Sequence, residues 1–297
     1  MRIAHVTDIH VMVPPKLSQL FGKRLLGTVN LMLMGRKSHF TEPVQLALAE
    51  SVGLANVDAI ICTGDISAQA TPEEFNKFEK LFGDLFDAQP TSLVTGNHDT
   101  YAYLAHKNKV MERRFGKYMG SGTYPRIHNL NDKFSVITLD SSRFHLLSSG
   151  KIASDELQRL DKILASMKDK KFFISLHYPL RGRDGTPYGP STRSLSNADE
   201  LEAVLIKYSN SIVAIVHGHE HHGFTTSLKG GERDIPIINP GASGYAWLPE
   251  HNRTAHYNIY TIGETDVSLD ISVERFQYSG TEGSFIAETG GSYATGR

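Results

Sequence analysis

Short runs of apolar and β-branched residues recur along the chain and alternate with polar segments. Runs of this kind, bounded by glycine, proline, asparagine or aspartate, are typical of buried β-strands. The predicted strands span residues 2–7, 58–64, 91–96, 134–140, 171–177, 211–218, 235–239 and 256–262.

Longer segments between several of these runs carry apolar residues at helical spacing. The predicted helices span residues 40–56, 71–86, 154–167 and 196–209. The second of them starts with Thr71, a proline and two glutamates, which is a typical helix start. Strands that alternate with helices predict an α/β domain, while the residues after about 210 predict mostly strands.

Composition narrows the class of protein. The chain has 297 residues, of which 40% are hydrophobic, so it can bury a sizeable core. Its formal net charge of -1 argues against nucleic acid as a partner, because no broad positive field would attract a polyanion. The single cysteine, Cys62, excludes an intrachain disulfide and fits a reducing compartment.

The chain opens with "MRIAHVTDIH", a strand-like run without the apolar region of a signal peptide. Its most membrane-like stretch is "LLGTVNLMLMG" between Arg24 and Arg36, whereas a spanning helix needs about 20 residues. We therefore expect a cytoplasmic protein, and leave open a peripheral contact with a membrane.

Polar side chains that can bind a metal lie at or just after the end of each of the first six predicted strands. They are Asp8, Asp65, Asn97, Asp140, His177 and His219. Ligand sites of open α/β sheets lie at the carboxyl ends of the strands. Carboxylate, amide and imidazole ligands suit manganese, iron or zinc, and the absence of cysteine among them argues against a thiolate site. We therefore expect a metal site built from several strands. Asp140 is expected to have a structural role or to support the metal ligands.

These residues belong to five short blocks, "TDIH", "TGDIS", "TGNHD", "LHYP" and "GHEH", which follow one another along the chain. The series D-x-H, G-D, G-N-H-D, H and G-H-x-H, from Asp8 to His221, resembles the calcineurin-like metallophosphoesterase family. The resemblance implies a four-layer α/β/β/α sandwich of two mixed sheets flanked by helices. We expect this domain to span residues 1–279. Residues 280–297, rich in glycine, serine and threonine, are expected to form a flexible tail.

The resemblance also implies a centre of two metal ions. Asp8, His10 and His221 would hold the first ion, Asn97, His177 and His219 would hold the second, and Asp65 would bridge both. The ions would be manganese, iron or zinc, and the sequence does not choose among them. His217 and His222, which flank the last block, are expected not to bind metal.

Such a centre implies phosphoester hydrolysis. The two ions would clamp an in-line displacement at phosphorus, with a metal-bridging hydroxide as the nucleophile. The resemblance assigns His98 to phosphate contact and to protonation of the leaving oxygen. Asp99 would orient His98, and the alternative for Asp99 is an ordinary turn residue.

Two segments look like insertions beside this centre, residues 14–40 and residues 179–195. Basic and large apolar residues interleave within 16–37, which indicates a lid over a lipid-like substrate, a membrane contact, a homodimer contact or packing on the domain itself. The second segment is a loop rich in glycine and proline. Its candidate substrate-binding residues are Arg181, Arg183 and Arg193.

Three functions are compatible with these features. The first is a phosphodiesterase acting on a small phosphodiester. The alternative is a lipid pyrophosphatase at the membrane surface, of the UDP-2,3-diacylglucosamine type, with a pyrophosphate substrate. The third is an inactive scaffold with the same fold, which the intact set of ligands argues against.

Overall fold

A computed structural model describes residues 1–16, 39–100, 106–142, 149–263 and 271–288 of the chain. The helices are α2 (Glu42–Leu54), α3 (Pro72–Ala88), α5 (Val110–Met119), α6 (Ser154–Ser166) and α7 (Ala198–Lys207). Two 3₁₀ turns, η3 (Ser209–Ser211) and η4 (Pro249–His251), also occur among these residues. The strands form two six-stranded sheets.

The first sheet has the order β12-β11-β10-β1-β2-β3. Its strands are β1 (Arg2–Val6), β2 (Ala59–Cys62), β3 (Thr91–Leu93), β10 (His256–Ile262), β11 (Ile271–Ser279) and β12 (Ser284–Ala287). The first three are parallel, and the last three join them as antiparallel neighbours. The sheet therefore pairs the two ends of the sequence.

The second sheet has the order β4-β5-β6-β7-β9-β8. Its strands are β4 (Arg126–Asn129), β5 (Phe134–Thr138), β6 (Lys171–Ser175), β7 (Ile212–Val216), β8 (His222–Leu228) and β9 (Ile235–Gly241). The four central strands are parallel, and β4 and β8 are antiparallel edges. Both sheets are therefore mixed.

Side chains on the two faces of each strand enter different apolar layers. In β2, Ala59 and Ile61 pack between the two sheets, whereas Ile60 and Cys62 pack under the helices. The same alternation in the second sheet places Phe173 between the sheets and Ile174 under α6 and α7. Because every central strand is covered on both faces, its sequence is almost continuously apolar.

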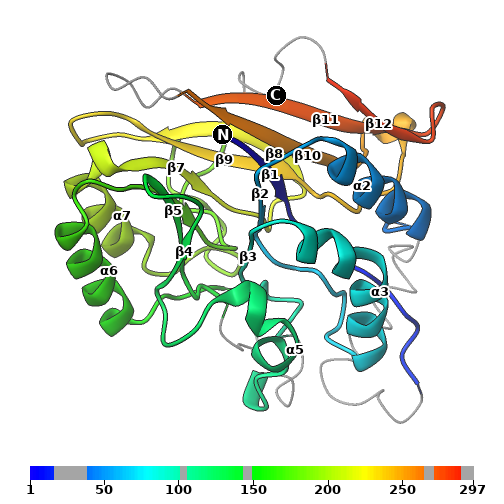
Figure 1. Ribbon diagram of the computed structural model, residues 1–297, viewed down its shortest axis with the longest axis horizontal. Helices are drawn as coiled ribbons and strands as arrows, with labels where there is room; N and C mark the ends of the chain where they lie inside the picture. The colour runs from blue at the N-terminus through cyan, green and yellow to red at the C-terminus, as the bar shows by residue number, and fades with distance from the viewer. Residues whose placement is uncertain (17–38, 101–105, 143–148, 264–270, 289–297) are drawn as a thin grey trace.

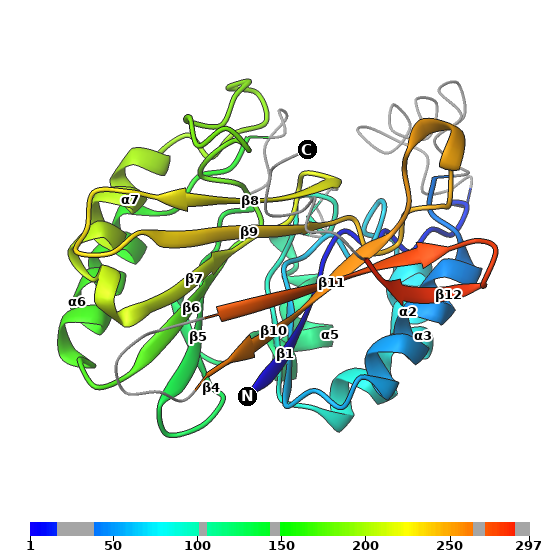
Figure 2. The same ribbon diagram turned by 90° about the horizontal axis from the view of Figure 1, so that it is seen from above.

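The result is the four-layer α/β/β/α sandwich that the sequence predicts. Figure 1 shows α6 and α7 on one side of the molecule, α2 and α3 on the other, and the strands between them. Viewed from above, β9 of the second sheet lies beside β10 and β11 of the first (Figure 2). The two sheets therefore face each other, and the helices cover their outer faces.

All the predicted strands and helices exist; the strand at residues 256–262 has the predicted bounds, and the others have shifted ends. The elements without a sequence prediction are α5, β4, β8, β11 and β12. Edge strands such as β4 and β8 are half polar, because one face meets solvent, so they lack the apolar run used to predict the central strands.

The prediction of a flexible tail over residues 280–297 is wrong for part of this range. Residues 284–287 form β12, which pairs with β11. Phe285 of this strand is buried against Tyr257 and Tyr278, an apolar contact that the glycine-rich composition around it hides. Residues 289–297 lie outside the described part of the chain.

Within the described residues, no helix is long and apolar enough to cross a membrane. Most of the basic-apolar insertion, residues 17–38, lies outside the described part, so its role stays a prediction. Its last residue, Phe40, is described and reaches the candidate site.

Candidate metal centre

The candidate ligands follow the carboxyl ends of β1, β2, β3, β6 and β7, where the two sheets meet. Four of them, Asp8, His10, Asp65 and His219, have positive φ angles of 49°, 48°, 54° and 70°. A positive φ is uncommon for residues other than glycine and is concentrated at functional sites, where the surrounding structure holds it. The sharp backbone turns bring side chains from separate strands to one point.

Two glycines of the blocks are required by close packing at this point. A Cβ atom on Gly96 would lie 2.0 Å from Oδ1 of Asp65. A Cβ atom on Gly218 would lie 2.0 Å from Oγ1 of Thr7 and 2.6 Å from Oδ2 of Asp8. The glycines of the G-N-H-D and G-H-x-H blocks therefore leave room for the carboxylates.

The first group of donors comprises Asp8, His10 and His221. Oδ1 of Asp8 lies 3.6 Å from Nε2 of His10 and 3.6 Å from Nε2 of His221. The two imidazole Nε2 atoms lie 3.3 Å apart. These three side chains form a compact group that could hold a metal ion.

The second group comprises Asn97, His177 and His219. Oδ1 of Asn97 lies 3.2 Å from Nε2 of His177 and 2.9 Å from Nδ1 of His219. The His177 ring donates through Nδ1 to the carbonyl of Thr63 at 2.8 Å, which leaves its Nε2 lone pair directed at the group.

Asp65 lies between the two groups. Its Oδ2 is 3.3 Å from Nε2 of His177 and 3.8 Å from Nε2 of His10, so it touches both sets of donors. Its Oδ1 accepts the backbone N–H of His98 at 2.7 Å, which holds the carboxylate in this position.

The donors fit two metal ions. Ligands bonded to one ion at about 2.1 Å, in tetrahedral or octahedral geometry, lie about 3.0–3.4 Å from one another. The separations within each group are close to these values. Oδ1 of Asp8 is buried and has no hydrogen-bond partner among the described residues, although both imidazoles surround it. An ion at this point would satisfy that oxygen.

The charges of the site also favour cations. Burial acts to raise the pKa of Asp8, but the nearby imidazoles of His10 and His221 outweigh it and hold the pKa well below its usual range. Burial acts to lower the pKa of His177, but the charge of Asp65 outweighs it and raises this pKa to about 9. The buried carboxylates of Asp8 and Asp65 stay ionised only beside positive charge. Without metal, a proton on His177 supplies it, and a bound ion would replace that proton and leave the Nε2 lone pair free to bind.

His98 lies beside the first group, with a ring nitrogen within 4.8 Å of donor atoms of His10 and Asp65. Its Nδ1 donates to the carbonyl of Ala68 at 2.7 Å. Burial lowers the pKa of His98 to about 4, so the ring is neutral near pH 7.

The expected role of Asp99 as the residue that orients His98 is wrong. Asp99 accepts hydrogen bonds from the backbone and hydroxyl of Ser67, both 2.9 Å, and from the backbone of Gly96 at 3.0 Å. It ties the two ligand loops together, and the backbone carbonyl of Ala68 holds His98 instead. The alternative given in the sequence analysis, an ordinary turn residue, describes Asp99 better.

The two histidines that flank the last block lie apart from the metal groups. His217 is buried, donates through Nδ1 to the carbonyl of Gly218 at 2.9 Å and packs against Phe224. His222 is exposed and begins β8. Neither belongs to a group of potential ligands among the described residues.

The loop 179–195 contacts the site through Glu220, the residue between His219 and His221. The Tyr188 hydroxyl donates to Oε1 of Glu220, and Nη2 of Arg193 lies 3.9 Å from the same oxygen. Arg181 instead forms a two-point ion pair with Glu202 of α7, so its guanidinium anchors the loop and is not available to a substrate. Arg183 is exposed, and its guanidinium carbon lies 5.9 Å from the centre of the Phe224 ring.

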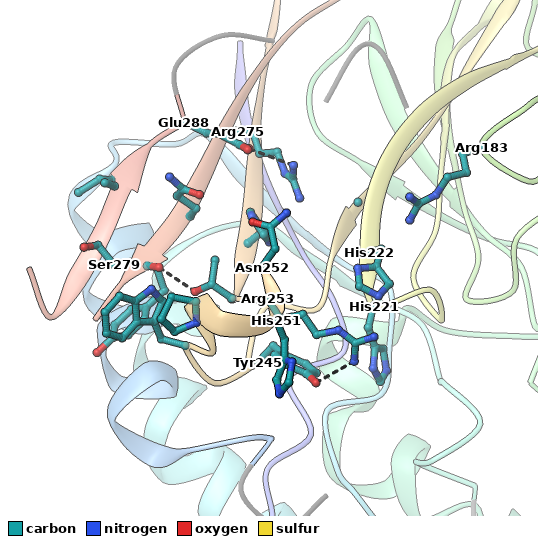
Figure 3. Close-up of a pocket in the computed structure, with 18 residues that line it drawn as sticks. Arg183, His221, His222, Tyr245, His251, Asn252, Arg253, Arg275, Ser279 and Glu288 are labelled. Atoms are coloured by element: carbon teal, nitrogen blue, oxygen red, sulfur yellow. Dashed lines mark hydrogen bonds and ion pairs between the residues drawn. The ribbon is translucent and has the colours of Figure 1, made fainter. Parts of the chain in front are cut away.

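Two features beside the centre have no motif in the sequence. The ring of Phe40 lies 4.4 Å from that of His10 and 5.6 Å from that of His221, measured between ring centres. A pocket of about 630 Å³ adjoins His221 and is lined by residues of β8, β10, β11, β12 and the turn around η4 (Figure 3). Sequence spacing could not reveal it, because these residues come from separate strands of the last third of the chain.

Comparison with known proteins places the chain among phosphoesterases. The family model described as calcineurin-like phosphoesterase matches residues 1–223, which include every candidate ligand.

Two curated relatives have similar names. A probable cyclic nucleotide phosphodiesterase of Vesicomyosocius okutanii is 28% identical over 170 residues, which cover 56% of this chain and 63% of the relative. A probable glycerophosphodiester phosphodiesterase of Arcobacter nitrofigilis is 29% identical over 171 residues, which cover 57% of this chain and 58% of the relative. The match thus spans less than two thirds of each relative.

Among solved structures, a dimetal phosphatase from Danio rerio superposes with a TM-score of 0.63 at 14% identity, covering 96% of this chain and 98% of that chain. At this identity the likeness concerns the fold alone.

Proposed function

Because this chain belongs to the calcineurin-like phosphoesterase family, whose members are metal-dependent phosphohydrolases, we propose that it is a phosphodiesterase with a two-metal centre. The observation that carries the proposal is the pair of donor groups that share Asp65. Asp8, His10 and His221 would hold one ion, and Asn97, His177 and His219 the other. Manganese, iron and zinc all suit these donors.

Two ions held in this way lower the pKa of a bound water and take up charge that develops on the phosphoryl oxygens. The residues of the chain do the rest. The backbone N–H of His98 keeps Asp65 between the groups, and the Thr63 carbonyl keeps His177 in its ligating tautomer. The His98 ring is held by the Ala68 carbonyl through Nδ1, so Nε2 is the nitrogen that would contact the phosphoryl group. The ring would protonate the leaving oxygen only after Nε2 had taken up a proton, which the water that attacks phosphorus would supply.

The names of the relatives support a small diester as the substrate. One is named as a probable cyclic nucleotide phosphodiesterase and the other as a probable glycerophosphodiester phosphodiesterase. Arg183 and Arg193, which belong to the loop beside the centre, are the proposed substrate contacts from that loop.

The proposal is tested with purified protein, Mn²⁺ and bis(p-nitrophenyl) phosphate. We expect turnover that a chelator abolishes and that Mn²⁺ restores. Asn97→Ala removes the donor at the centre of the second group. It should reduce kcat by more than the roughly 10–100-fold that loss of a residue supporting a metal ligand costs. Asn210→Ala, an exposed amide far along the chain, is the matched control and should keep full turnover.

If the intact chain neither hydrolysed the substrate nor bound metal, this function would be contradicted and the inactive scaffold would be supported instead. A screen of cyclic nucleotides, glycerophosphodiesters and UDP-diacylglucosamine with the metal-loaded protein would separate a soluble diester from the lipid pyrophosphate alternative.

The cytoplasmic location, the homodimer and the membrane contact through residues 16–37 also remain proposals. The membrane contact is supported by the basic-apolar composition of that segment. Flotation with anionic liposomes should be lost when residues 16–37 are deleted, whereas equal flotation of both forms would exclude the contact.

A further inference from the structure

The pocket beside His221 adjoins the candidate metal centre through Tyr245 and Arg253. The ring of Tyr245, buried in its wall, lies 6.3 Å from the ring of His221, measured between centres. The Tyr245 hydroxyl accepts a hydrogen bond from Nη1 of Arg253 at 3.1 Å. Figure 3 shows Arg253 and Tyr245 on the side of the pocket where His221 lies.

Arg253 lies at the end of a tight turn. Its backbone N–H and C=O both pair with those of Leu248, at 3.1 and 2.8 Å, and this pairing closes the turn around η4. The hydrogen bond to Tyr245 holds the guanidinium near the metal groups. A side chain fixed in this way loses little freedom when it binds a ligand.

The pocket carries positive charge that its own carboxylate does not neutralise. Arg275 pairs with Glu288 at 3.0 Å, and Glu288 is the only carboxylate among the lining residues that the structure describes. Arg183 and Arg253 form no ion pair within the described residues: one lies near the Phe224 ring and the other bonds a neutral hydroxyl. Both arginines line the pocket and belong to neither donor group. Because the metal ions would neutralise the scissile phosphoryl group, the two arginines remain available to a second anionic group.

The far part of the pocket is apolar. Trp247 and Ile286 line it and are among the few large hydrophobic side chains exposed in the described part of the chain, at 40% and 39%. Tyr278 completes this wall. At about 630 Å³ the pocket has the size of typical small-molecule sites.

We propose that this pocket binds a second phosphoryl group of the substrate through Arg253 and Arg183, with the organic part of the substrate against Trp247. The proposal rests on the proposed phosphodiesterase function and narrows its substrate class. The preferred substrate is a diester whose retained group carries another phosphate, such as a nucleoside bisphosphate ester. Diesters with one charge would occupy the metal centre alone.

Two chromogenic substrates that differ only in this group test the proposal. They are the p-nitrophenyl ester of thymidine 5′-phosphate and the same ester with an added 3′-phosphate. The intact enzyme should prefer the bisphosphate ester in kcat/KM. In Arg253→Met that preference should fall about tenfold, the expected loss of one charged hydrogen bond. Arg253→Lys should restore part of it.

Arg113→Met on α5, an exposed arginine outside this pocket, is the matched control and should leave both rates and their ratio unchanged. An equal loss of kcat/KM for both esters in Arg253→Met would overturn the proposal, because the arginine would then serve the scissile phosphate. Full retention of both rates in Arg253→Met would overturn it as well.

A second readout does not depend on turnover. Trp247 is the only tryptophan of the chain, so its fluorescence reports this wall of the pocket. Thymidine 3′,5′-bisphosphate should change the emission of the metal-loaded protein at lower concentration than thymidine 5′-phosphate does, and Arg253→Met should remove the difference. This result without turnover of either ester would refute the phosphodiesterase function while upholding the pocket. Turnover of both esters, with no difference between the two nucleotides in binding, would refute the pocket alone.

Discussion

At the residue scale, the site is built from side chains whose neighbours decide their role. "VHGHEHHG" contains four histidines, yet the structure brings only His219 and His221 to the donor groups. His217 lies before the turn at Gly218 and is packed inside, and His222 has already entered β8. The backbone geometry after β7, more than the chemistry of the ring, decides which histidines are candidate ligands.

This selection predicts the metal content of two neighbouring variants. His221→Ala removes a donor of the first group, so bound metal should fall by about one ion per chain when it is measured by mass spectrometry of the desalted protein. His222→Ala removes an exposed ring and should keep the full content. Equal metal content in both variants would contradict the assignment of His221.

A second residue-scale prediction concerns stability and pH. Burial and the nearby His217 lower the pKa of His5 to about 3, from 6.5 in the unfolded chain. The unfolded chain therefore binds the proton first, and stability falls as the pH drops below 6.5. Between pH 7 and pH 5 this one group should cost about 2 kcal/mol of unfolding free energy.

Denaturant unfolding of His5→Gln and the intact chain at both pH values measures this contribution. Glutamine does not titrate, so the pH-dependent loss should be about 2 kcal/mol smaller in the variant. Exchange of the exposed His106 for glutamine should leave the pH dependence unchanged. The idea fails if His5→Gln and the intact chain lose the same free energy.

At the element scale, α3 shows how local signals and packing agree. The Thr71 hydroxyl accepts the backbone N–H of Glu74, and the Glu74 carboxylate accepts that of Thr71, a capping box. Phe75, Phe78, Phe82 and Phe86 then recur at helical spacing and are all buried under the first sheet. Start signal and apolar face therefore specify the same helix.

Removal of the cap should weaken this helix. Thr71→Ala deletes the accepting oxygen and should lower the free energy of unfolding by about 1 kcal/mol. Thr71→Ser keeps the oxygen and should retain most of that stability. Denaturant melts of both variants provide the measurement, and similar losses in the two would show that the hydroxyl contributes nothing.

The loop 179–195 gives a second prediction for an element. Its ion pair between Arg181 and Glu202 is only partly exposed, so loss of one partner leaves a poorly solvated charge. In Glu202→Gln the loop should open more often, and chymotrypsin should cut after Tyr188 several times faster. Glu200→Gln, an exposed position on the same helix, should keep the rate of the intact chain.

At the scale of the whole molecule, the centre joins the two sheets. Asp8, Asp65 and Asn97 follow strands of the first sheet, and His177 and His219 follow strands of the second. Ions shared by these ligands would therefore stabilise the contact between the sheets, in addition to any role in hydrolysis.

This coupling predicts that metal removal lowers the melting temperature. A ligand at 100 times its Kd stabilises the folded state by about 2.7 kcal/mol, which corresponds to several degrees in a chain of this size. Thermal melts with Mn²⁺ and with chelator should show this difference. It should shrink in His221→Ala, and an unchanged melting temperature after chelation would argue that the ions do not link the sheets.

The sequence by itself determined the fold class, the central strands, most helices and the family, which the comparisons confirm. It could do so because a strand buried on both faces must be apolar throughout and a phosphoesterase block is read from adjacent residues. It also supplied the candidate donors. The sequence did not predict the edge strands, because their half-polar sequences resemble those of loops. It also did not predict β12 within the glycine-rich end.

Only the tertiary structure decided which carboxylates and arginines lie free at the site and which are engaged by neighbouring side chains. Asp99 and Arg181 have the residue types of site residues, but the neighbours Ser67 and Glu202 engage them. Arg253 carries no motif, yet the antiparallel return of the last strands places it beside the pocket that adjoins His221. A charged side chain acts through its spatial neighbours, and those neighbours come from segments that sequence spacing does not connect.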